Sequence, residues 1–503
     1  MKIKALSRSL DAHAPQRQGD PSPVMRNLDP ALHPFDKPRE YTRALNAAKL
    51  DRLFAKPFVA ALEGHIDGIY SLAKDSKRLN VVASGSGDGE IRLWNLGRQA
   101  PIYVYPKAHA GIIQSICISP LTFTSPTNPG SAGRRMLSCS TDRTVKLWDA
   151  DPRPDGLGTE VLGDRDDDDD GEDDEDAEMT ASGSARRGGL MSTRGKDVPP
   201  SEPLAVFSGK SAFNSLSHHA VSPIFASSSS SIQTWDLNRG GGSDPLRTMT
   251  WGAEAINVVR FNPSEQEVLA SAGSDRGVVL YDLRSGKPLT KMVMQMRAND
   301  LAWSPIEPTT FALASEDQNV YTFDMRNLSS ATQIYKDHVA AVMSVDWSPT
   351  GQELVTGSYD RTIRLWEVGR GNHSRDVYHT KRMQRIFSTA FTMDARFVLS
   401  GSDDGNLRIW KAKASEKLGI LNSREMASRE YAESLRKRWR NTGDVAKIER
   451  QRHVPKAIKQ AQKLKRTMLD ARMQKEDNRR KHTKSGDKKP KAARKAPILA
   501  QKD

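Results

Sequence analysis

The chain has 503 residues and a formal net charge of +14, enough length for two or three domains or one large repeat array. Its two cysteines, Cys117 and Cys139, lack the number and spacing of a disulfide framework or a zinc site, so no metal or cofactor is expected. No window supplies the roughly 18 apolar residues of a membrane helix, and the start lacks the apolar core of a secretory signal. We therefore expect an intracellular protein that does not enter a membrane.

The charge is distributed unevenly along the chain. Residues 411–503 hold 29 Lys or Arg and 11 Asp or Glu, whereas residues 164–178 hold 12 acids and one Arg. Blocks of like charge repel themselves and bury little, so the insertion at about 151–202 that contains this acidic run is predicted to be disordered. The basic character belongs to the C-terminal region.

Residues 1–57 come first in chain order and read as an extended arm that leads into a short helix. Pro38 suits the first turn of this helix, and Pro57 would end it. The side chains that recur on one face are Tyr41, Leu45, Ala48 and Arg52. We expect this face to pack against another part of the molecule.

Residues 58–411 contain a repeated phrase, seen as GSGDGEIRLWNL ending at Leu96 and GSYDRTIRLWEV ending at Val368. Seven copies are found, and their aromatic markers are Trp94, Trp148, Trp235, Tyr281, Phe323, Trp366 and Trp410. The last four intervals, of 46, 42, 43 and 44 residues, match the period of a four-stranded propeller blade. The longer intervals need insertions, including one at 120–135 with the composition of a loop. With alternating residues typical of strands, the array predicts an all-β, seven-bladed propeller.

These copies resemble the WD-repeat family, in which a His, a strand Ser or Thr, a turn Asp and the Trp form a buried network within a blade. The residues that this resemblance assigns are His65, Ser84, Asp88 and Trp94 in the first blade, Asp142 and Trp148 in the second, and His338, Thr356, Asp360 and Trp366 in the sixth. The third blade departs from the pattern, with Lys210 in the His place and Ser229 in the Asp place. No such network is expected there.

The ends of the array indicate how the ring closes. PFVAALEGH, before the first copy, reads as a strand, and after Trp410 the strand alternation is lost. We expect residues 58–62 to supply the outer strand of the last blade, because this leaves no open sheet edge across the ring.

Residues 412–484 are predicted to form two basic amphipathic helices, and residues 485–503 a disordered basic tail. Asn422 and Glu425 have the spacing of a capping box, and Pro455 suits the start of the second helix. The candidate protein-docking residues are the apolar side chains Tyr431, Leu435, Leu464 and Met468. Their partner is either the propeller itself or another protein.

The cations of these helices outnumber the local acids, so pairing along the helix cannot neutralise them. RKRWR at 436–440 combines groups that contact phosphates with planar groups that stack on unpaired bases. The candidate RNA-binding residues are Arg436, Arg438, Trp439, Arg440, Arg450, Arg452, His453, Lys456 and Lys459. RNA, or another polyanion, is the predicted partner.

The segments on both sides of the repeats resemble the Sof family of WD-repeat proteins. The resemblance is carried by NLDPALHPF, REYTRALNAAKL, AKPF and GHIDG in front and by REYAESLRKRW and RQRHVPKAI behind. It implies a non-catalytic factor of the small-subunit processome that binds pre-rRNA, box C/D small nucleolar ribonucleoprotein and other processome proteins. A nucleolar location is implied as well, and KKPKAARK at 488–495 fits a nuclear import signal.

A second class of function is a substrate receptor of a cullin-RING ubiquitin ligase. YDLR and FDMR, in consecutive repeats, look like degenerate WDxR boxes, which some propellers use to bind the ligase adaptor. The residues concerned are Asp282, Arg284, Asp324 and Arg326. An Arg two positions after the Asp that ends a strand can also pair locally, so the boxes have a purely structural interpretation.

Two further classes are less favoured by the sequence. Net charge alone suggests a propeller that binds histones or chromatin, but charge does not identify the partner. An enzyme is not expected, because the set of His, Ser and Asp recurs in several blades, whereas catalysis needs one site. GxSxG, HExxH and phosphate-binding loop motifs are missing from the chain, and no small-molecule substrate is expected.

Overall fold

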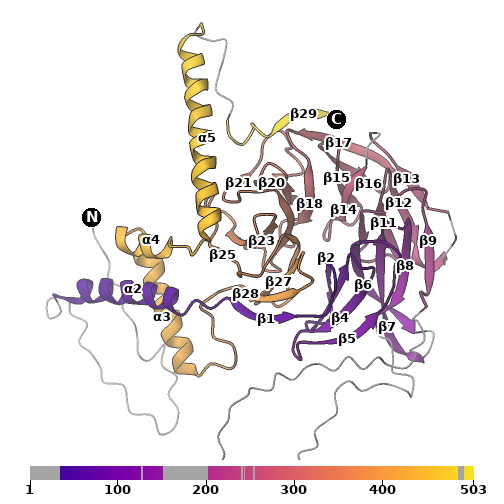
Figure 1. Ribbon diagram of the computed structural model, residues 1–503, viewed down its shortest axis with the longest axis horizontal. Helices are drawn as coiled ribbons and strands as arrows, with labels where there is room; N and C mark the ends of the chain where they lie inside the picture. Colours follow the sequence, from indigo (N-terminus) through magenta and orange to yellow (C-terminus); the bar gives the residue numbers. More distant parts are fainter. Residues whose placement is uncertain are drawn as a thin grey trace, which may run out of the picture.

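The computed structural model contains a ring of seven antiparallel sheets, which confirms the predicted seven-bladed β-propeller (Figure 1). It describes residues 34–125, 128–150, 202–239, 242, 244–252, 255–484 and 492–502. The acidic run at 164–178 and the first half of the import-signal stretch, 488–491, lie outside these residues.

Each blade has four strands that are consecutive in sequence, except that blade 7 takes β1 at the point of closure and blade 4 gains a fifth strand, described below. Blade 1 has β2 (Ile69–Lys74), β3 (Val81–Ser86), β4 (Ile91–Asn95) and β5 (Ala100–Tyr105); blade 2 has β6 (Ile113–Ser125), β7 (Asn128–Ser140), β8 (Thr144–Asp149) and β9 (Ala205–Ser208). Blade 3 has β10 (Ser215–His218), β11 (Ile224–Ser228), β12 (Ile232–Asp236) and β13 (Arg247–Met249), with the short helix η1 (Leu237–Arg239) after β12.

The second half of the ring repeats this order. Blade 4 has β14 (Ile256–Phe261), β15 (Val268–Gly273), β16 (Gly277–Asp282) and β17 (Lys287–Met294); blade 5 has β18 (Ala298–Trp303), β19 (Thr310–Ser315), β20 (Val320–Asp324) and β21 (Gln333–Tyr335). Blade 6 has β22 (Val342–Trp347), β23 (Glu353–Ser358), β24 (Ile363–Glu367) and β25 (Asp376–Tyr378); blade 7 has β26 (Ile386–Phe391), β27 (Phe397–Ser402), β28 (Leu407–Lys411) and β1 (Phe58–Leu62).

The strands form where side chains alternate between a buried and a less buried face. In β8, Val145 and Leu147 are buried and Lys146 between them is partly exposed. Among the described residues, seven buried apolar clusters lie one at each seam between neighbouring blades. Burial of apolar surface between blades therefore holds the ring together.

The insertion at 120–135 is an exception to the loop expected from its composition. β6 runs on to Ser125 and β7 begins at Asn128, and Thr122 pairs with Arg134 across the two strands. Backbone pairing between two adjacent strands extended the hairpin despite the residues typical of loops.

The ring closes as predicted, through a strand from before the first repeat. β1 pairs antiparallel with β28, with Phe58 opposite Trp410 and Leu62 opposite Leu407. Leu62 is only 2% exposed and joins the buried cluster between blades 7 and 1. The last blade is thus completed by the start of the array.

Truncated chains that begin at Ala55 and at Gly64 should therefore differ in stability. Both lack the N-terminal helix, but only the longer one retains β1. Burial of a leucine side chain such as Leu62 contributes about 1.5–3 kcal/mol, and loss of β1 also exposes the edge of β28. We expect a lower melting temperature for the shorter chain in scanning calorimetry. Equal melting temperatures would show that β1 does not stabilise the closed ring.

The C-terminal end differs from the disordered basic tail that was expected at 485–503. Within the described part of this segment, β29 (Ile498–Lys502) pairs antiparallel with β17 as a fifth strand of blade 4. Ile498 is 6% exposed and belongs to the cluster between blades 4 and 5. The physical reason is that an uncharged stretch, APILAQ at 496–501, can cover the open edge of β17.

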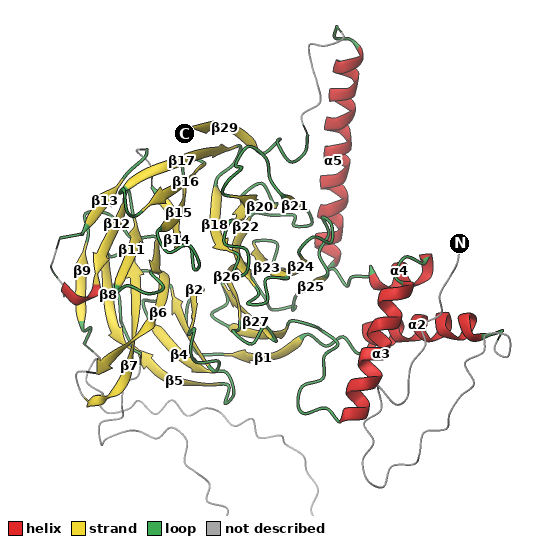
Figure 2. Cartoon of the chain, turned by 180° about the vertical axis from the view of Figure 1, so that it is seen from behind, coloured by secondary structure: helices red, strands yellow, loops and turns green. Residues whose placement is uncertain are grey.

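Four helices lie outside the ring in the described part of the chain. They are α2 (Asp36–Leu53), α3 (Ser423–Trp439), α4 (Gly443–Glu449) and α5 (Lys456–Lys481). The first three are grouped beside the ring, whereas α5 stands away from it (Figures 1 and 2). In the described residues, no helix has the length and apolar character needed to cross a membrane.

Candidate interaction surfaces

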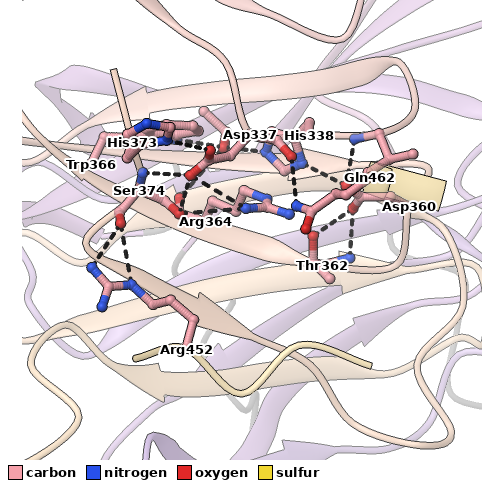
Figure 3. Close-up of polar contacts among 12 residues, drawn as sticks. Asp337, His338, Asp360, Thr362, Arg364, Trp366, His373, Ser374, Arg452 and Gln462 are labelled. Carbon is pink, nitrogen blue, oxygen red and sulfur yellow. Dashed lines mark hydrogen bonds and ion pairs between the residues drawn. The ribbon is translucent and has the colours of Figure 1, made fainter. Parts of the chain in front are cut away.

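Blade 6 contains a buried chain of hydrogen bonds around His338 (Figure 3). The imidazole Nδ1 lies 2.9 Å from Asp360 Oδ2, and Nε2 lies 2.7 Å from Thr356 Oγ1. The indole N–H of Trp366 donates to the same threonine hydroxyl at 2.9 Å. Burial lowers the pKa of His338, which is 1% exposed and so has no access to a substrate. This arrangement ties a turn to the strands.

Blade 2 has the same arrangement, in which His109 and Ser138 join the assigned Asp142 and Trp148. His109 Nδ1 lies 2.9 Å from Asp142 Oδ2 and its Nε2 lies 2.7 Å from Ser138 Oγ, to which Trp148 donates at 2.8 Å. The repetition of one buried set in two blades indicates a structural role.

Blade 1 is less complete. His65 Nε2 lies 2.7 Å from Ser84 Oγ, which also accepts the Trp94 indole N–H at 2.7 Å. Asp88 instead accepts the backbone N–H groups of Ile66 and Glu90. The Nδ1 atom of His65 is buried without a hydrogen-bond partner among the described residues. The network implied for this blade therefore lacks its link from His to Asp.

The N-terminal arm and the C-terminal region form one three-helix unit. α2 packs against both α3 and α4, and Ala44 and Ala48 of α2 are buried together with Leu435 and Val445. Two of the stretches that carry the Sof resemblance, REYTRALNAAKL on α2 and REYAESLRKRW on α3, are separated by the whole ring in sequence but adjacent in space (Figure 2).

Polar contacts across this unit use two cations that were candidates for RNA. Arg438 Nη1 lies 3.1 Å from Glu40 Oε1, and Arg436 Nη1 lies 2.7 Å from Asp51 Oδ2. These acids come from α2, almost 400 residues away in sequence, and no local pattern could reveal them. Arg436 and Arg438 are therefore engaged within the chain.

The tryptophan of the same cluster is also engaged. The Trp439 ring meets Tyr41 edge to face, with ring centroids 5.5 Å apart. Tyr41 donates its hydroxyl hydrogen to Asp444 Oδ2 at 2.7 Å, and this bond raises the pKa of the tyrosine. Arg440 lies more loosely, 3.9 Å from Glu449.

Two arginines fasten the three-helix unit to blade 6. Arg52 donates to Asp376 Oδ1 at 2.9 Å and to the Glu449 carbonyl at 2.7 Å. Arg452 donates to the Ser374 carbonyl through Nε at 3.2 Å and Nη2 at 3.0 Å (Figure 3). Burial, with a contribution from nearby Arg52, lowers the pKa of Arg452 to about 10. Arg452 is thus an anchor between the helices and the ring.

Replacing Arg452 with Gln should loosen the junction of α4 and α5 while leaving the ring folded. A buried carbonyl that loses its donor costs about 1–3 kcal/mol. We expect faster hydrogen exchange at 444–465 and unchanged exchange in β22–β24, measured by mass spectrometry. Arg450→Gln is the matched control, because Arg450 is exposed. Equal exchange at 444–465 in both variants would refute an anchoring role.

α5 contacts the ring only near its start. Gln462 donates to the Asp337 carbonyl at 3.1 Å, and Lys465 donates to the His338 carbonyl at 2.8 Å. No residue of this 26-residue helix is buried. Leu464 and Met468 are 64% and 65% exposed, so their apolar face does not dock on the propeller.

The remaining candidate RNA-binding and docking residues are exposed or partly buried. Arg450, Lys456 and Lys459 are exposed and form no ion pair with a described residue. His453 is also exposed, and its ring stacks on that of His379 with centroids 5.3 Å apart. Tyr431 is partly buried.

The WDxR-like boxes lie at the turns after β16 and β20. Asp282 Oδ1 accepts the backbone N–H of Arg284 at 2.8 Å, and Asp324 Oδ1 accepts that of Arg326 at 3.0 Å. The carboxylates therefore have a local structural role. Both arginine side chains are exposed, that of Arg284 by 79%, with Glu267 at 3.9 Å.

Known protein families match both the propeller and the C-terminal region. A family model described as "Sof1-like domain" matches residues 412–498, and one described as "WD domain, G-beta repeat" matches residues 56–95, 100–149, 329–367 and 376–411. The former match begins after the last blade and ends at β29.

Full-length relatives are similar over almost the whole chain. "Protein SOF1" of Saccharomyces cerevisiae is 42% identical over 485 residues, which cover 96% of this chain and 92% of the relative. "DDB1- and CUL4-associated factor 13" is 40% identical over 500 residues in Xenopus laevis, with 99% of both chains covered. Its Homo sapiens counterpart is 39% identical over 486 residues, with 97% of this chain and 96% of the relative covered. With identity of this extent across ring and flanks alike, the chain belongs to the Sof1 family of WD-repeat proteins.

Proposed function

We propose that this protein is a non-catalytic scaffold of ribosome biogenesis, which acts in the small-subunit processome in the nucleolus. Its ring and three-helix unit hold assembly proteins, and its basic C-terminal region contacts pre-rRNA within particles that contain box C/D small nucleolar ribonucleoprotein. The similarity to Protein SOF1 over ring and flanks supports this proposal. So does the Sof1-like domain at 412–498.

The observation that carries the proposal is the exposed helix α5. Its 26 residues include ten Lys or Arg and three Asp or Glu. A helix that stands away from its own protein, with unburied apolar side chains and a large excess of cations, suits a partner made of both protein and RNA. Its anchored start would give that contact a defined position relative to the ring.

The proposed roles follow the exposure of each side chain. Arg450, Lys456 and Lys459 contact phosphates, and Leu464 and Met468 dock on a protein surface. Arg436, Arg438 and Arg452 hold the helices in place, since each has a partner within the chain.

The test is purification of the tagged full-length chain from cells, followed by sequencing of the RNA that accompanies it. The proposal expects pre-rRNA and box C/D RNAs at amounts well above those recovered with an unrelated propeller of similar charge. Recovery of neither RNA class would refute the role in ribosome biogenesis.

A second candidate is a substrate receptor of a cullin-RING ubiquitin ligase. It is favoured by the name of the vertebrate relatives, which associates them with DDB1 and CUL4. The exposed Arg284 and Arg326 side chains are the residues that would meet the adaptor. Loss of adaptor binding in the Arg284→Ala, Arg326→Ala variant, with RNA recovery unchanged, would support this role; unchanged adaptor binding would count against these boxes.

A further inference from the structure

Three aromatic side chains form a group on the propeller, far in sequence from the basic helices. Tyr70 of β2 stacks on Phe387 of β26, with centroids 4.5 Å apart and planes inclined by 16°. Tyr359, in the turn after β23, meets Phe387 edge to face at 5.9 Å. The group thus spans blades 6, 7 and 1. It crosses the seam between blades 7 and 1, where the ring closes.

One cation contacts this aromatic group, and three more belong to the same turn and loop. The guanidinium carbon of Arg385 lies 5.5 Å from the centroid of the Tyr359 ring. Arg361 belongs to the same turn as Tyr359, and Lys381 and Arg382 belong to the same loop as Arg385. These four side chains are exposed and have no ion pair with any described residue.

The backbone holds these side chains in place while leaving them accessible. The N–H of Tyr359 donates to the Ala341 carbonyl at 3.1 Å, and the Arg385 carbonyl accepts the N–H of Asp403 at 2.9 Å. Tyr359 is nevertheless 39% exposed. A planar side chain fixed at the surface loses little conformational entropy when a ligand stacks on it.

The start of α5 lies next to the same turn. Lys465 donates to the His338 carbonyl, and the His338 ring contacts Asp360, which directly follows Tyr359 in the sequence. α5 and the turn that carries Tyr359 are therefore neighbours on blade 6.

The chemistry of this group is that which the RKRWR stretch was expected to supply. There, Trp439 packs against Tyr41, and Arg438 pairs with Glu40. Here, the rings contact one another and Arg385, but Tyr359 remains 39% exposed and Arg385 has no ion pair with a described residue. Aromatic rings and arginines at the end of a basic surface are typical of sites that stack unpaired bases.

We propose that Tyr359, Phe387, Tyr70 and Arg385 form a stacking platform for unpaired nucleotides of RNA, a second RNA site that is distinct from α5. The choice of RNA as the ligand rests on the proposed function, because a surface of this chemistry can also bind a peptide. Tyr359 and Arg385 make the first contact with a base, and Phe387, itself stacked on Tyr70, supports the Tyr359 ring.

A basic peptide is the other ligand to consider, because Asp67 and Asp403 raise the pKa of Tyr70 and so lie close to it. Burial is the larger cause of that shift. Arg385 already occupies the cation–π position on Tyr359, and Arg361, Lys381 and Arg382 add three exposed cations in the same turn and loop. A further arginine or lysine would meet repulsion there, whereas a phosphate would be attracted.

The test uses the full-length chain and a photoreactive oligouridylate of about 12 nucleotides, a length that one stacking surface and its surroundings can accommodate. Tyr359→Ala should weaken binding about tenfold, through loss of one stacked base, without changing the dependence on salt. Arg385→Gln should weaken binding and also make the salt dependence shallower by about 0.7. Tyr359→Phe, which keeps the ring, should bind like the unaltered chain.

The control for loss of one exposed positive charge is Arg143→Gln, because Arg143 is exposed and holds in blade 2 the turn position that Arg361 holds in blade 6. This variant should bind the oligouridylate only slightly more weakly than the unaltered chain, because it loses one distant charge. Its crosslinks should be those of the unaltered chain. In the unaltered chain, crosslinks should map to residues 359–387 as well as to α5. In Tyr359→Ala, the first set should be lost and the second retained.

Three results would overturn the platform. One is unchanged affinity of Tyr359→Ala together with crosslinks that map only to the C-terminal helices. Another is binding of an arginine-rich peptide that is abolished by Asp67→Asn, Asp403→Asn and not weakened by Arg385→Gln. The third is an effect of Arg143→Gln as large as that of Arg385→Gln. In all three cases, recovery of pre-rRNA with the tagged chain would leave the proposed function standing.

Discussion

Replacing Arg450, Lys456 and Lys459 together with Gln is expected to weaken binding of single-stranded pre-rRNA roughly 50-fold at physiological salt. Each phosphate contact with single-stranded RNA contributes about −0.7 to the slope of log K against log salt, so the slope should become shallower by up to about 2. The measurement is a salt titration of the dissociation constant. The melting temperature should not change, because all three side chains are exposed.

The matched control removes the same charge from the other side of the molecule. Arg98, Lys107 and Arg143 are exposed on blades 1 and 2, and their replacement by Gln should reduce affinity only slightly. Leu464→Ser, Met468→Ser should weaken docking to a protein partner and leave the salt slope nearly unchanged. If the triple variant binds with unaltered affinity and slope, the cations of this region serve an acidic protein surface instead of RNA.

The second large effect is loss of stability in mild acid. Burial, reinforced by Arg92, lowers the pKa of His65 to about 4, and burial lowers that of His218 to about 4. In an unfolded chain, histidine titrates at about 6.5. The unfolded state therefore takes up protons first, and stability present above about pH 6.5 is lost as the pH falls toward 4. Each histidine should cost about 3 kcal/mol across this window.

Calorimetry at a series of pH values from about 7 to about 4 would measure this loss. His65→Gln should lower the melting temperature near neutrality, and its further fall in acid should be smaller than in the unaltered chain. His482→Gln, at an exposed position, is the control and should behave as the unaltered chain does. A melting temperature that stays level down to about pH 4.5 would contradict the burial of neutral imidazoles.

The ring was predictable because its evidence is local and repeated. Each blade is a short run of alternating residues that ends in an aromatic marker such as Trp94 or Trp366, and the period of the copies predicts the number of blades. Closure by β1 followed from the same pattern, because an alternating stretch before the first repeat had no other strand to pair with. Periodicity along the chain is sufficient for such inferences, since strand pairing is between neighbours in sequence.

The role of the flanking charges was not predictable in this way. Arg438 and Arg436 look unpaired when only their own helix is considered, but Glu40 and Asp51 approach them from the other end of the chain. Arg452 likewise finds its partner in a carbonyl of blade 6. A count of charges along one segment cannot include acids or carbonyls that another segment brings within 2.7 to 3.1 Å.

The sequence by itself thus determined the fold class, the number of blades, the way in which the ring closes and the family. Only the tertiary structure decided which cations remain exposed, that β29 covers the edge of blade 4, and that Tyr359 and Arg385 meet at the surface between two blades. The physical reason is one of range. Backbone periodicity acts over a few residues, whereas ion pairs, buried imidazoles and aromatic groups depend on which distant segments pack together.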